Sequence, residues 1–131
     1  MQITLDNPAS APQPLSPYYS QVARVEHPDG SALLFLSGQI AEGATVAEQS
    51  RGIFETIATL LAAHGATLAD VINIRTCLTD IGALHEYGAV RQEFITGTPP
   101  TSMTFEVPKL FRPEAQIEVE VVAAVSPRPA A

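Results

Sequence analysis

The chain has 131 residues, a length that fits one folded domain and leaves little room for a second. Hydrophobic residues make up 46% of the sequence and charged residues 16%, which is enough apolar material for a core. The formal net charge of -7, with seven lysines and arginines in total, argues against a nucleic-acid-binding surface or an anionic membrane surface.

Cysteines, histidines and apolar runs exclude several further classes of protein. Cys77 is the only cysteine, so no intrachain disulfide can form. The segment Met1–Asn7 lacks a basic stretch followed by an apolar run, and no apolar run approaches the length of a membrane span. His27, His64 and His85 do not share a metal-ligand spacing. We therefore expect a cytoplasmic protein with no metal and no cofactor, which binds neither membranes nor nucleic acid.

The N-terminal part of the chain predicts a β-hairpin after an irregular lead-in. Residues 1–16 form the lead-in, which is rich in proline, alanine and serine from Asn7 onward. Two short apolar-rich runs follow, at Gln21–Glu26 and Ala32–Ser37. The turn sequence His27–Gly30 lies between them, with a proline that presets φ and a glycine that tolerates positive φ.

The next segment predicts a helix with a recognisable start and end. Thr45 and Glu48 fit a capping box, in which the threonine serves free backbone N–H groups and the glutamate reaches back. Gly65 is placed to end the helix. The helical spacing is carried by Ile53, Phe54, Ile57, Leu60 and Leu61.

The C-terminal half predicts three strands and a second helix. Val71–Leu78 reads as a strand, and Asp80 is placed to cap a helix that runs to about Thr96. Two more strands are expected at Thr101–Val107 and Ala115–Ala124. The order β-β-α-β-α-β-β predicts a single α+β domain over residues 1–131, with a mixed sheet, both helices on one face, and a tail at 125–131.

Strand alternation predicts a polar sheet face opposite the helices. Side chains alternate across a strand, so the polar positions of three strands gather on one side. That side would carry Asn73, Arg75, Ser102, Thr104, Glu106, Glu118 and Glu120. Two helices cover only one side of such a sheet. Alternation alone leaves open whether the second side faces water or another subunit.

Five stretches of the sequence, in order and at matching spacing, resemble one known family. These are Pro17–Gln21 (P-Y-Y-S-Q), Leu36–Ile40 (L-S-G-Q-I), His64–Val71 (H-G-A-T-L-A-D-V), Leu78–Asp80 (L-T-D) and Ile117–Glu120 (I-E-V-E). They are similar to the motifs of the RidA/YjgF family, the reactive-intermediate deaminases. Together they cover the chain from about residue 17 to residue 124.

The resemblance implies an assembly as well as a fold. It implies a chorismate-mutase-like fold and a homotrimer, in which three sheets pack into a central β-barrel and small-molecule pockets lie between subunits. Members of the family hydrolyse enamines and imines to a 2-keto acid and ammonia. Some relatives have been described as ribonucleases or translation inhibitors, a role that the acidic charge balance of this chain makes a poor fit.

The resemblance also implies the roles of particular residues. Glu118 matches the glutamate thought to hold the attacking water, which makes it the candidate catalytic residue. Ser37 and Gly38 match the Ser-Gly pair of the family, which makes them candidate substrate-binding residues. The pocket tyrosine corresponds to Tyr19 if the following Ser-Gln sets the register, and to Tyr18 if the preceding proline does; we prefer Tyr19.

One departure from the family motif concerns substrate binding. Where the deaminases read P-A-R-S-C-V-E-V, this chain has Ser102 at the arginine position and Thr104 at the cysteine position. A serine cannot replace the planar, bidentate guanidinium that binds a substrate carboxylate. Arg75 and Arg112 are both candidates to supply the missing cation. The predicted substrate-binding residues are Tyr19, Ser37, Gly38, Arg75, Ser102 and Thr104.

Two functions therefore stay open at the level of the sequence. The first is an enzyme that acts on an enamine, an imine or a similar reactive intermediate, without being an orthodox 2-imino acid deaminase. The second is a non-catalytic homotrimer that binds a metabolite or a protein partner. The match at Glu118 and Tyr19 favours the first function, and the loss of the arginine favours the second or a changed substrate.

Overall fold

A computed structural model describes residues 1–127, where one mixed β-sheet packs against two α-helices. Residues 128–131 of the expected tail lie outside the described residues. The strands are β1 (Gln2–Asp6), β2 (Val22–Glu26), β3 (Ala32–Leu36), β4 (Val71–Leu78), β5 (Thr101–Glu106) and β6 (Ile117–Val125). The helices are α1 (Val46–Ala62) and α2 (Leu84–Phe94), with short 3-10 turns η1 (Leu68–Asp70) and η2 (Ile81–Ala83).

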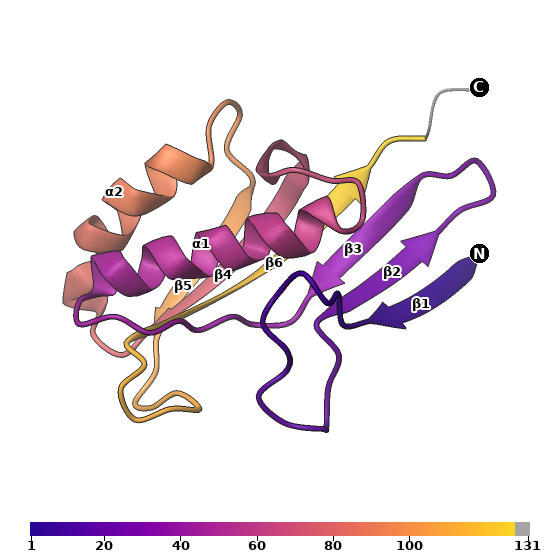
Figure 1. Ribbon diagram of the computed structural model, residues 1–131. Helices are drawn as coiled ribbons and strands as arrows, with labels where there is room; N and C mark the ends of the chain where they lie inside the picture. The colour runs from indigo at the N-terminus through magenta and orange to yellow at the C-terminus, as the bar shows by residue number, and fades with distance from the viewer. Residues whose placement is uncertain (128–131) are drawn as a thin grey trace.

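The six strands follow the order β1-β2-β3-β6-β4-β5 across the sheet. The pair β4 and β5 is parallel and is joined through α2, whereas the other neighbouring strands are antiparallel. Both helices lie on one side of the sheet, and β1 and β2 extend beyond them (Figure 1). The α+β class, the mixed sheet and the one-sided helices are therefore confirmed.

Helix α1 begins and ends close to where its sequence signals predict. The Thr45 side chain accepts a hydrogen bond from the Glu48 backbone N–H at 3.1 Å, and the Glu48 carboxylate accepts one from the backbone N–H of Ala44. Gly65 adopts a positive φ of 74°, which lets the chain turn back after the helix. All five apolar residues of the predicted helical stripe are buried against the sheet.

Helix α2 packs against α1 and β4 through aromatic side chains. The Phe54 ring stacks on Tyr87 and on Phe94, with centroid distances of 6.2 and 5.3 Å. The Tyr87 hydroxyl forms a buried 2.7 Å hydrogen bond with the Thr76 hydroxyl of β4. This packing fixes the parallel β4–β5 pair beneath α2.

One strand was not expected. We predicted an irregular lead-in over residues 1–16, but Gln2–Asp6 forms β1 and pairs antiparallel with β2. The His64 ring and the Asp6 carboxylate lie 2.9 Å apart, which joins the end of this strand to the turn after α1. The segment after β1 is irregular, as predicted, and returns the chain to β2.

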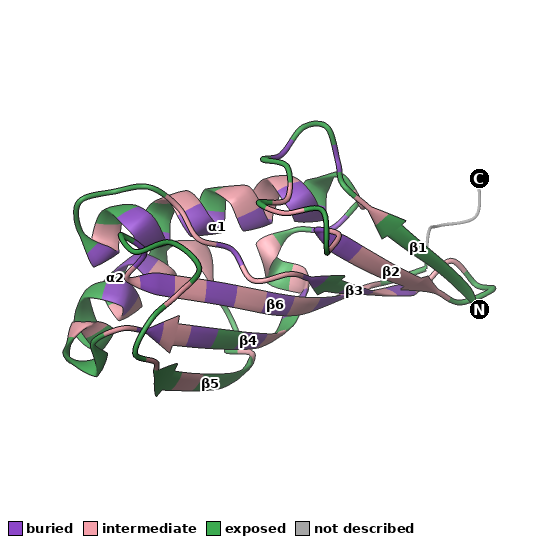
Figure 2. Ribbon diagram, turned by 90° about the horizontal axis from the view of Figure 1, so that it is seen from below, coloured by how far each residue is buried: buried purple, intermediate pink, exposed green. Residues whose placement is uncertain are grey.

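The side of the sheet away from the helices is uncovered and partly apolar. The edge strands β1 and β5 are largely exposed, whereas β4 and β6 alternate between buried and less buried residues (Figure 2). Side chains that pair across this side and remain exposed include Ile3, Leu5, Phe35, Met103 and Phe105. Within residues 1–127, no helix is long and apolar enough to cross a membrane.

Candidate functional site

The carboxylate of Glu118 lies directly against the backbone of Gly38. A Cβ atom placed on Gly38 would overlap Oε2 of Glu118 and lie 2.9 Å from its Cδ. The two residues meet because Gln39 and Val119 exchange backbone hydrogen bonds of 2.8 and 3.1 Å just beyond β3. The glycine therefore makes room for the carboxylate, as expected for a residue that permits close approach.

Burial and a like charge together favour the protonated form of Glu118. Desolvation is the larger cause and the neighbouring carboxylate of Glu120 the smaller one, and both raise the pKa of Glu118. Arg75 does not oppose this shift through direct pairing, because its guanidinium forms a 3.0 Å ion pair with Glu120. Alternation along β6 correctly predicted that Glu118 and Glu120 share a face.

A small cavity, here called the Glu118 cavity, opens beside this carboxylate. Its volume is about 240 Å³, and it is lined by Leu15, Tyr19, Ser37, Gly38, Ile40, Phe111 and Glu118. Three of the predicted substrate-binding residues, Tyr19, Ser37 and Gly38, therefore lie around the predicted catalytic residue. The structure brings these four together from β6, the end of β3 and the segment before β2.

Hydrogen bonds fix the two polar side chains next to Glu118. The Tyr19 hydroxyl accepts a 2.8 Å bond from the backbone N–H of Leu15, so its own proton points elsewhere. The Ser37 hydroxyl donates to the backbone carbonyl of Ser20 at 2.7 Å. Tyr18 is 92% exposed and does not line this cavity, whereas Tyr19 does.

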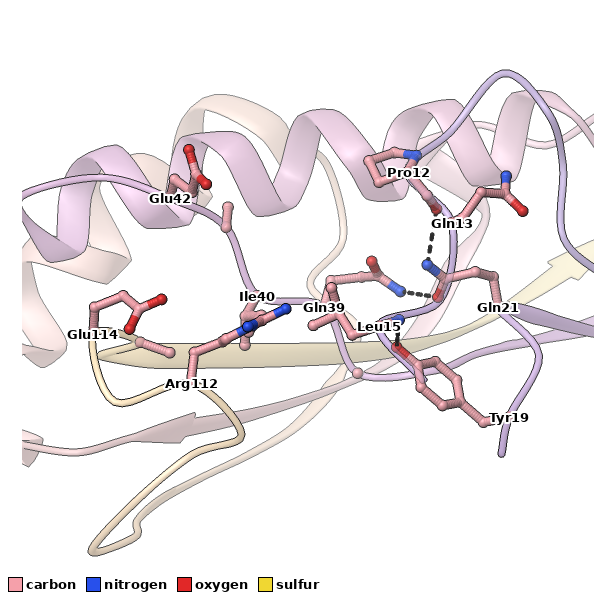
Figure 3. Close-up of a pocket in the computed structure, with 13 residues that line it drawn as sticks. Pro12, Gln13, Leu15, Tyr19, Gln21, Gln39, Ile40, Glu42, Arg112 and Glu114 are labelled. Atoms are coloured by element: carbon pink, nitrogen blue, oxygen red, sulfur yellow. Dashed lines mark hydrogen bonds between the residues drawn. The ribbon is translucent and has the colours of Figure 1, made fainter. Parts of the chain in front are cut away.

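A second cavity, here called the Arg112 cavity (Figure 3), adjoins the first, because four residues line both. Its volume is about 310 Å³, and it shares Leu15, Tyr19, Gly38 and Ile40 with the Glu118 cavity. Arg112 extends into it from the loop between β5 and β6 (Figure 3). The carboxylate-bearing residues Glu42 and Glu114 also line it, but neither forms an ion pair with Arg112 in the described part of the chain.

Three buried glutamines hold the walls of the cavities, and none of them was predicted as a site residue. Gln39 donates to the Gln21 side chain at 2.7 Å, and Gln21 donates to the carbonyl of Pro12. Gln49 on α1 donates to the carbonyl of Glu114 and accepts from the backbone N–H of Gln116. A lone glutamine in a helix gives no sequence signal for this role, because its partners are more than 60 residues away.

The comparisons with known proteins agree on one family. A family profile described as endoribonuclease L-PSP matches residues 8–125. A RutC family protein from Saccharolobus solfataricus is 32% identical over 124 residues, covering 88% of this chain and 93% of that protein. The chain belongs to the RidA/YjgF family.

Solved structures support the same fold for this RidA/YjgF chain. Rv2704 from Mycobacterium tuberculosis, described as a member of the YjgF/YER057c/UK114 family, superposes with a TM-score of 0.80 at 28% identity. The superposition covers 95% of this chain and 100% of that one. TdcF from E. coli, solved with bound serine, gives a TM-score of 0.80 at 25% identity, covering 94% and 99% of the two chains. The chorismate-mutase-like fold is therefore confirmed.

Two of the predicted substrate-binding residues lie on the opposite side of the sheet from Glu118. Ser102 and Thr104 pair with Ile74 and Thr76 of β4 and therefore face the helices. The Ser102 hydroxyl accepts a 3.1 Å hydrogen bond from Arg91 of α2. The prediction that these two side chains share a face with Glu118 was wrong for the single chain.

On the Glu118 side, β5 carries the apolar residues Met103 and Phe105 together with Thr101. Met103 pairs with Arg75 and Phe105 with Cys77. A third cavity is lined by Phe105, Glu118 and Glu120 together with the predicted substrate-binding residue Arg75. Burial raises the pKa of the Cys77 thiol, and the charges of the two glutamates add to this effect. A protonated thiol is a poor nucleophile, so the raised pKa argues against a nucleophilic role for Cys77.

Proposed function

We propose that this RidA/YjgF protein is a homotrimeric acid–base enzyme that hydrolyses an imine or an enamine beside Glu118. The observation that carries the proposal is a carboxyl group with a raised pKa, held open to a cavity by the absence of a side chain at Gly38. Carboxyl groups tuned in this way exchange protons closer to neutral pH, as acid–base catalysis requires.

In the proposed reaction Glu118 acts as both acid and base, first in the addition of water and then in the loss of ammonia. The protonated carboxyl group donates its proton to the imine nitrogen, or to the carbon of an enamine, which makes the adjacent carbon electrophilic. The resulting carboxylate then orients a water molecule and takes its proton as the oxygen–carbon bond forms. Glu118 next returns this proton to the amino nitrogen and takes the proton of the new hydroxyl group as the carbon–nitrogen bond breaks, which releases ammonia, leaves a carbonyl compound and restores the protonated carboxyl group. The Tyr19 hydroxyl, already fixed by Leu15, is placed to donate to the substrate.

The exposed apolar residues opposite the helices support the homotrimer. Phe35, Met103 and Phe105 are 44%, 49% and 37% exposed in the single chain. Burying such residues against further copies of the chain would remove apolar surface from water, worth roughly 25 cal/mol per Å². In the trimer this uncovered side would form the central barrel and complete the clefts around Glu118.

A ribonuclease activity, which the description of the matching profile names, is less well supported. RNA binding depends on clustered cations, and this chain has a net charge of -7. Among the described residues that line the two adjoining cavities, Arg112 is the only lysine or arginine. This set of groups suits a small molecule rather than a phosphodiester chain.

The proposal is tested with imines formed in situ by an amino-acid oxidase from a panel of amino acids. Semicarbazide traps free imine, so hydrolysis by the protein lowers the yield of semicarbazone. We expect acceleration for at least one imine, and little for those of alanine and 2-aminobutanoate, whose only carboxylate adjoins the imine carbon. A family deaminase that retains the arginine serves as the positive control. No acceleration for any imine would contradict the proposal.

A further inference from the structure

We infer that Arg112 binds a carboxylate of the substrate at a distance from the reacting carbon, so that the substrate is elongated and spans both cavities. The inference rests on the proposed function, since it assigns the Glu118 cavity to the reacting group. It identifies the position of an anionic group and the residue that recognises it.

The two adjoining cavities hold the two side chains that the substrate would contact. Glu118 lines one cavity and Arg112 the other, and the two cavities adjoin along the four residues that they share. A molecule that contacts both side chains must therefore pass Tyr19 and Gly38. A carboxylate bonded directly to the reacting carbon would find no arginine or lysine among the described residues of the Glu118 cavity. Arg75 lines the third cavity together with Glu118, but its guanidinium is paired with Glu120.

Arg112 forms no ion pair among the described residues, and its neighbours hold it in place. Its backbone carbonyl accepts a 3.1 Å bond from Ala115, and Gln49 fixes the following segment by a 3.0 Å bond to the Glu114 carbonyl. The guanidinium carbon lies 5.5 Å from the centroid of the Phe111 ring, which orients it. The other cations near the sheet are engaged, Arg75 by Glu120 and Arg91 by Ser102 and Tyr87.

The groups around Arg112 favour a carboxylate over a phosphate as its ligand. Glu42 and Glu114 line the same cavity as Arg112. Two nearby carboxylates would repel a dianion more strongly than a single negative charge. The planar guanidinium also matches a carboxylate through two parallel hydrogen bonds.

Binding experiments test this inference without any need for turnover. The probe is 4-oxopentanoate, whose carboxylate is remote from the carbonyl, compared with its methyl ester and with pyruvate. Calorimetry on the wild-type homo-oligomer should show tighter binding of 4-oxopentanoate than of either other compound. Replacement Arg112→Gln should weaken the binding of 4-oxopentanoate about tenfold or more, the scale of a charge-assisted hydrogen bond. The affinity for the methyl ester should not change.

Two further variants make the result specific. Arg112→Lys keeps the charge without the planar fork and should bind with intermediate affinity. Lys109→Gln removes one positive charge from the same loop but lies outside the Arg112 cavity, so its affinity should equal that of the wild type. Equal affinities for the acid and its ester, or no effect of Arg112→Gln, would overturn the inference. Arg112-dependent binding without hydrolysis of any imine would instead contradict only the proposed function.

Discussion

Gly38 and Glu118 are in such close contact that the glycine determines where the carboxylate lies. A methyl group at residue 38 would overlap Oε2 of Glu118, so the carboxylate would have to move or the strands would have to separate. The raised pKa of Glu118 depends on its partly buried position against this backbone. The chemistry proposed for the site therefore depends on a residue that has no side chain.

Replacement Gly38→Ala should lower hydrolysis of a reactive imine about tenfold or more, because a displaced acid–base group loses its alignment. Gly88→Ala is the matched control. A Cβ at Gly88, in the middle of α2, would meet no atom within 4 Å. The control should keep full activity and gain about 0.5–1 kcal/mol of stability from helix propensity. Full activity in Gly38→Ala would show that the position of Glu118 is not critical.

Replacement Glu120→Gln should lower the pKa of Glu118. The glutamine removes the repelling charge and also frees Arg75, whose guanidinium then favours the ionised form of Glu118. The measurement is an NMR titration of the Glu118 side-chain carboxyl carbon in wild type and variant. A midpoint that stays in place or moves to higher pH would argue against the coupling between the two carboxylates.

Replacement Glu118→Gln should make the fold more stable at pH 8 and have little effect at pH 3. The pKa of Glu118 is raised in the folded chain, so its carboxyl group ionises less readily there than in the unfolded chain. Ionisation of this group therefore lowers the free energy of unfolding of the wild type. This cost grows as the pH rises from the unfolded pKa through the folded pKa, and it is absent below both. Urea unfolding at several pH values measures the difference, and a destabilised variant at pH 8 would reverse the assigned sign.

Ser50→Ala should leave stability unchanged or raise it by about 1 kcal/mol, because a buried polar group without a partner carries a desolvation cost. The Ser50 hydroxyl is fully buried in α1 and has no hydrogen-bond partner among the described residues. Ser102→Ala is the comparison, since its hydroxyl accepts a bond from Arg91 and its loss should cost stability. Thermal unfolding of both variants measures these changes in stability. A clear loss of stability in Ser50→Ala would indicate that the hydroxyl has a partner, such as a bound water.

The proposed homotrimer should have a mass of about three times the chain mass of 13.9 kDa. Light scattering on the purified protein at micromolar concentration measures it. Replacement Phe105→Glu should shift the assembly towards smaller species, because it places a charge among exposed apolar side chains on the uncovered side. A wild-type protein that is monomeric at this concentration would exclude both the trimer and clefts completed between subunits.

Local sequence signals predicted the elements that have strong local causes. The helix from Thr45, the turn at His27–Gly30 and the shared face of Glu118 and Glu120 each follow from capping, turn chemistry or alternation. The strand at Gln2–Asp6 was missed because its residues are mostly exposed and it is held at the sheet edge by pairing with β2. Its alternation of Ile3 and Leu5 with polar residues covers only five residues, which is a weak signal for a strand.

The wrong face for Ser102 and Thr104 has a related cause. We placed the apolar residues of β5 under the helices, which is the usual arrangement for a strand with one buried side. In the structure Met103 and Phe105 lie on the uncovered side, and polar Ser102 contacts Arg91. Alternation shows which residues share a face, but it does not show which face the helices cover. The orientation of Arg112 depends on a loop and a distant glutamine, which no local pattern describes.

The most direct test of the account compares Glu118→Gln with the wild type in the semicarbazide assay. The imine is formed in situ from glutamate, because it carries a carboxylate remote from the reacting carbon. The charge-matched control is Glu55→Gln, an exposed residue of α1 outside the cavities. We expect Glu118→Gln to lower the rate of hydrolysis about 10²-fold or more with an unchanged oligomer mass, and the control to keep the wild-type rate. Wild-type hydrolysis rates in Glu118→Gln would contradict the proposed role of this carboxyl group.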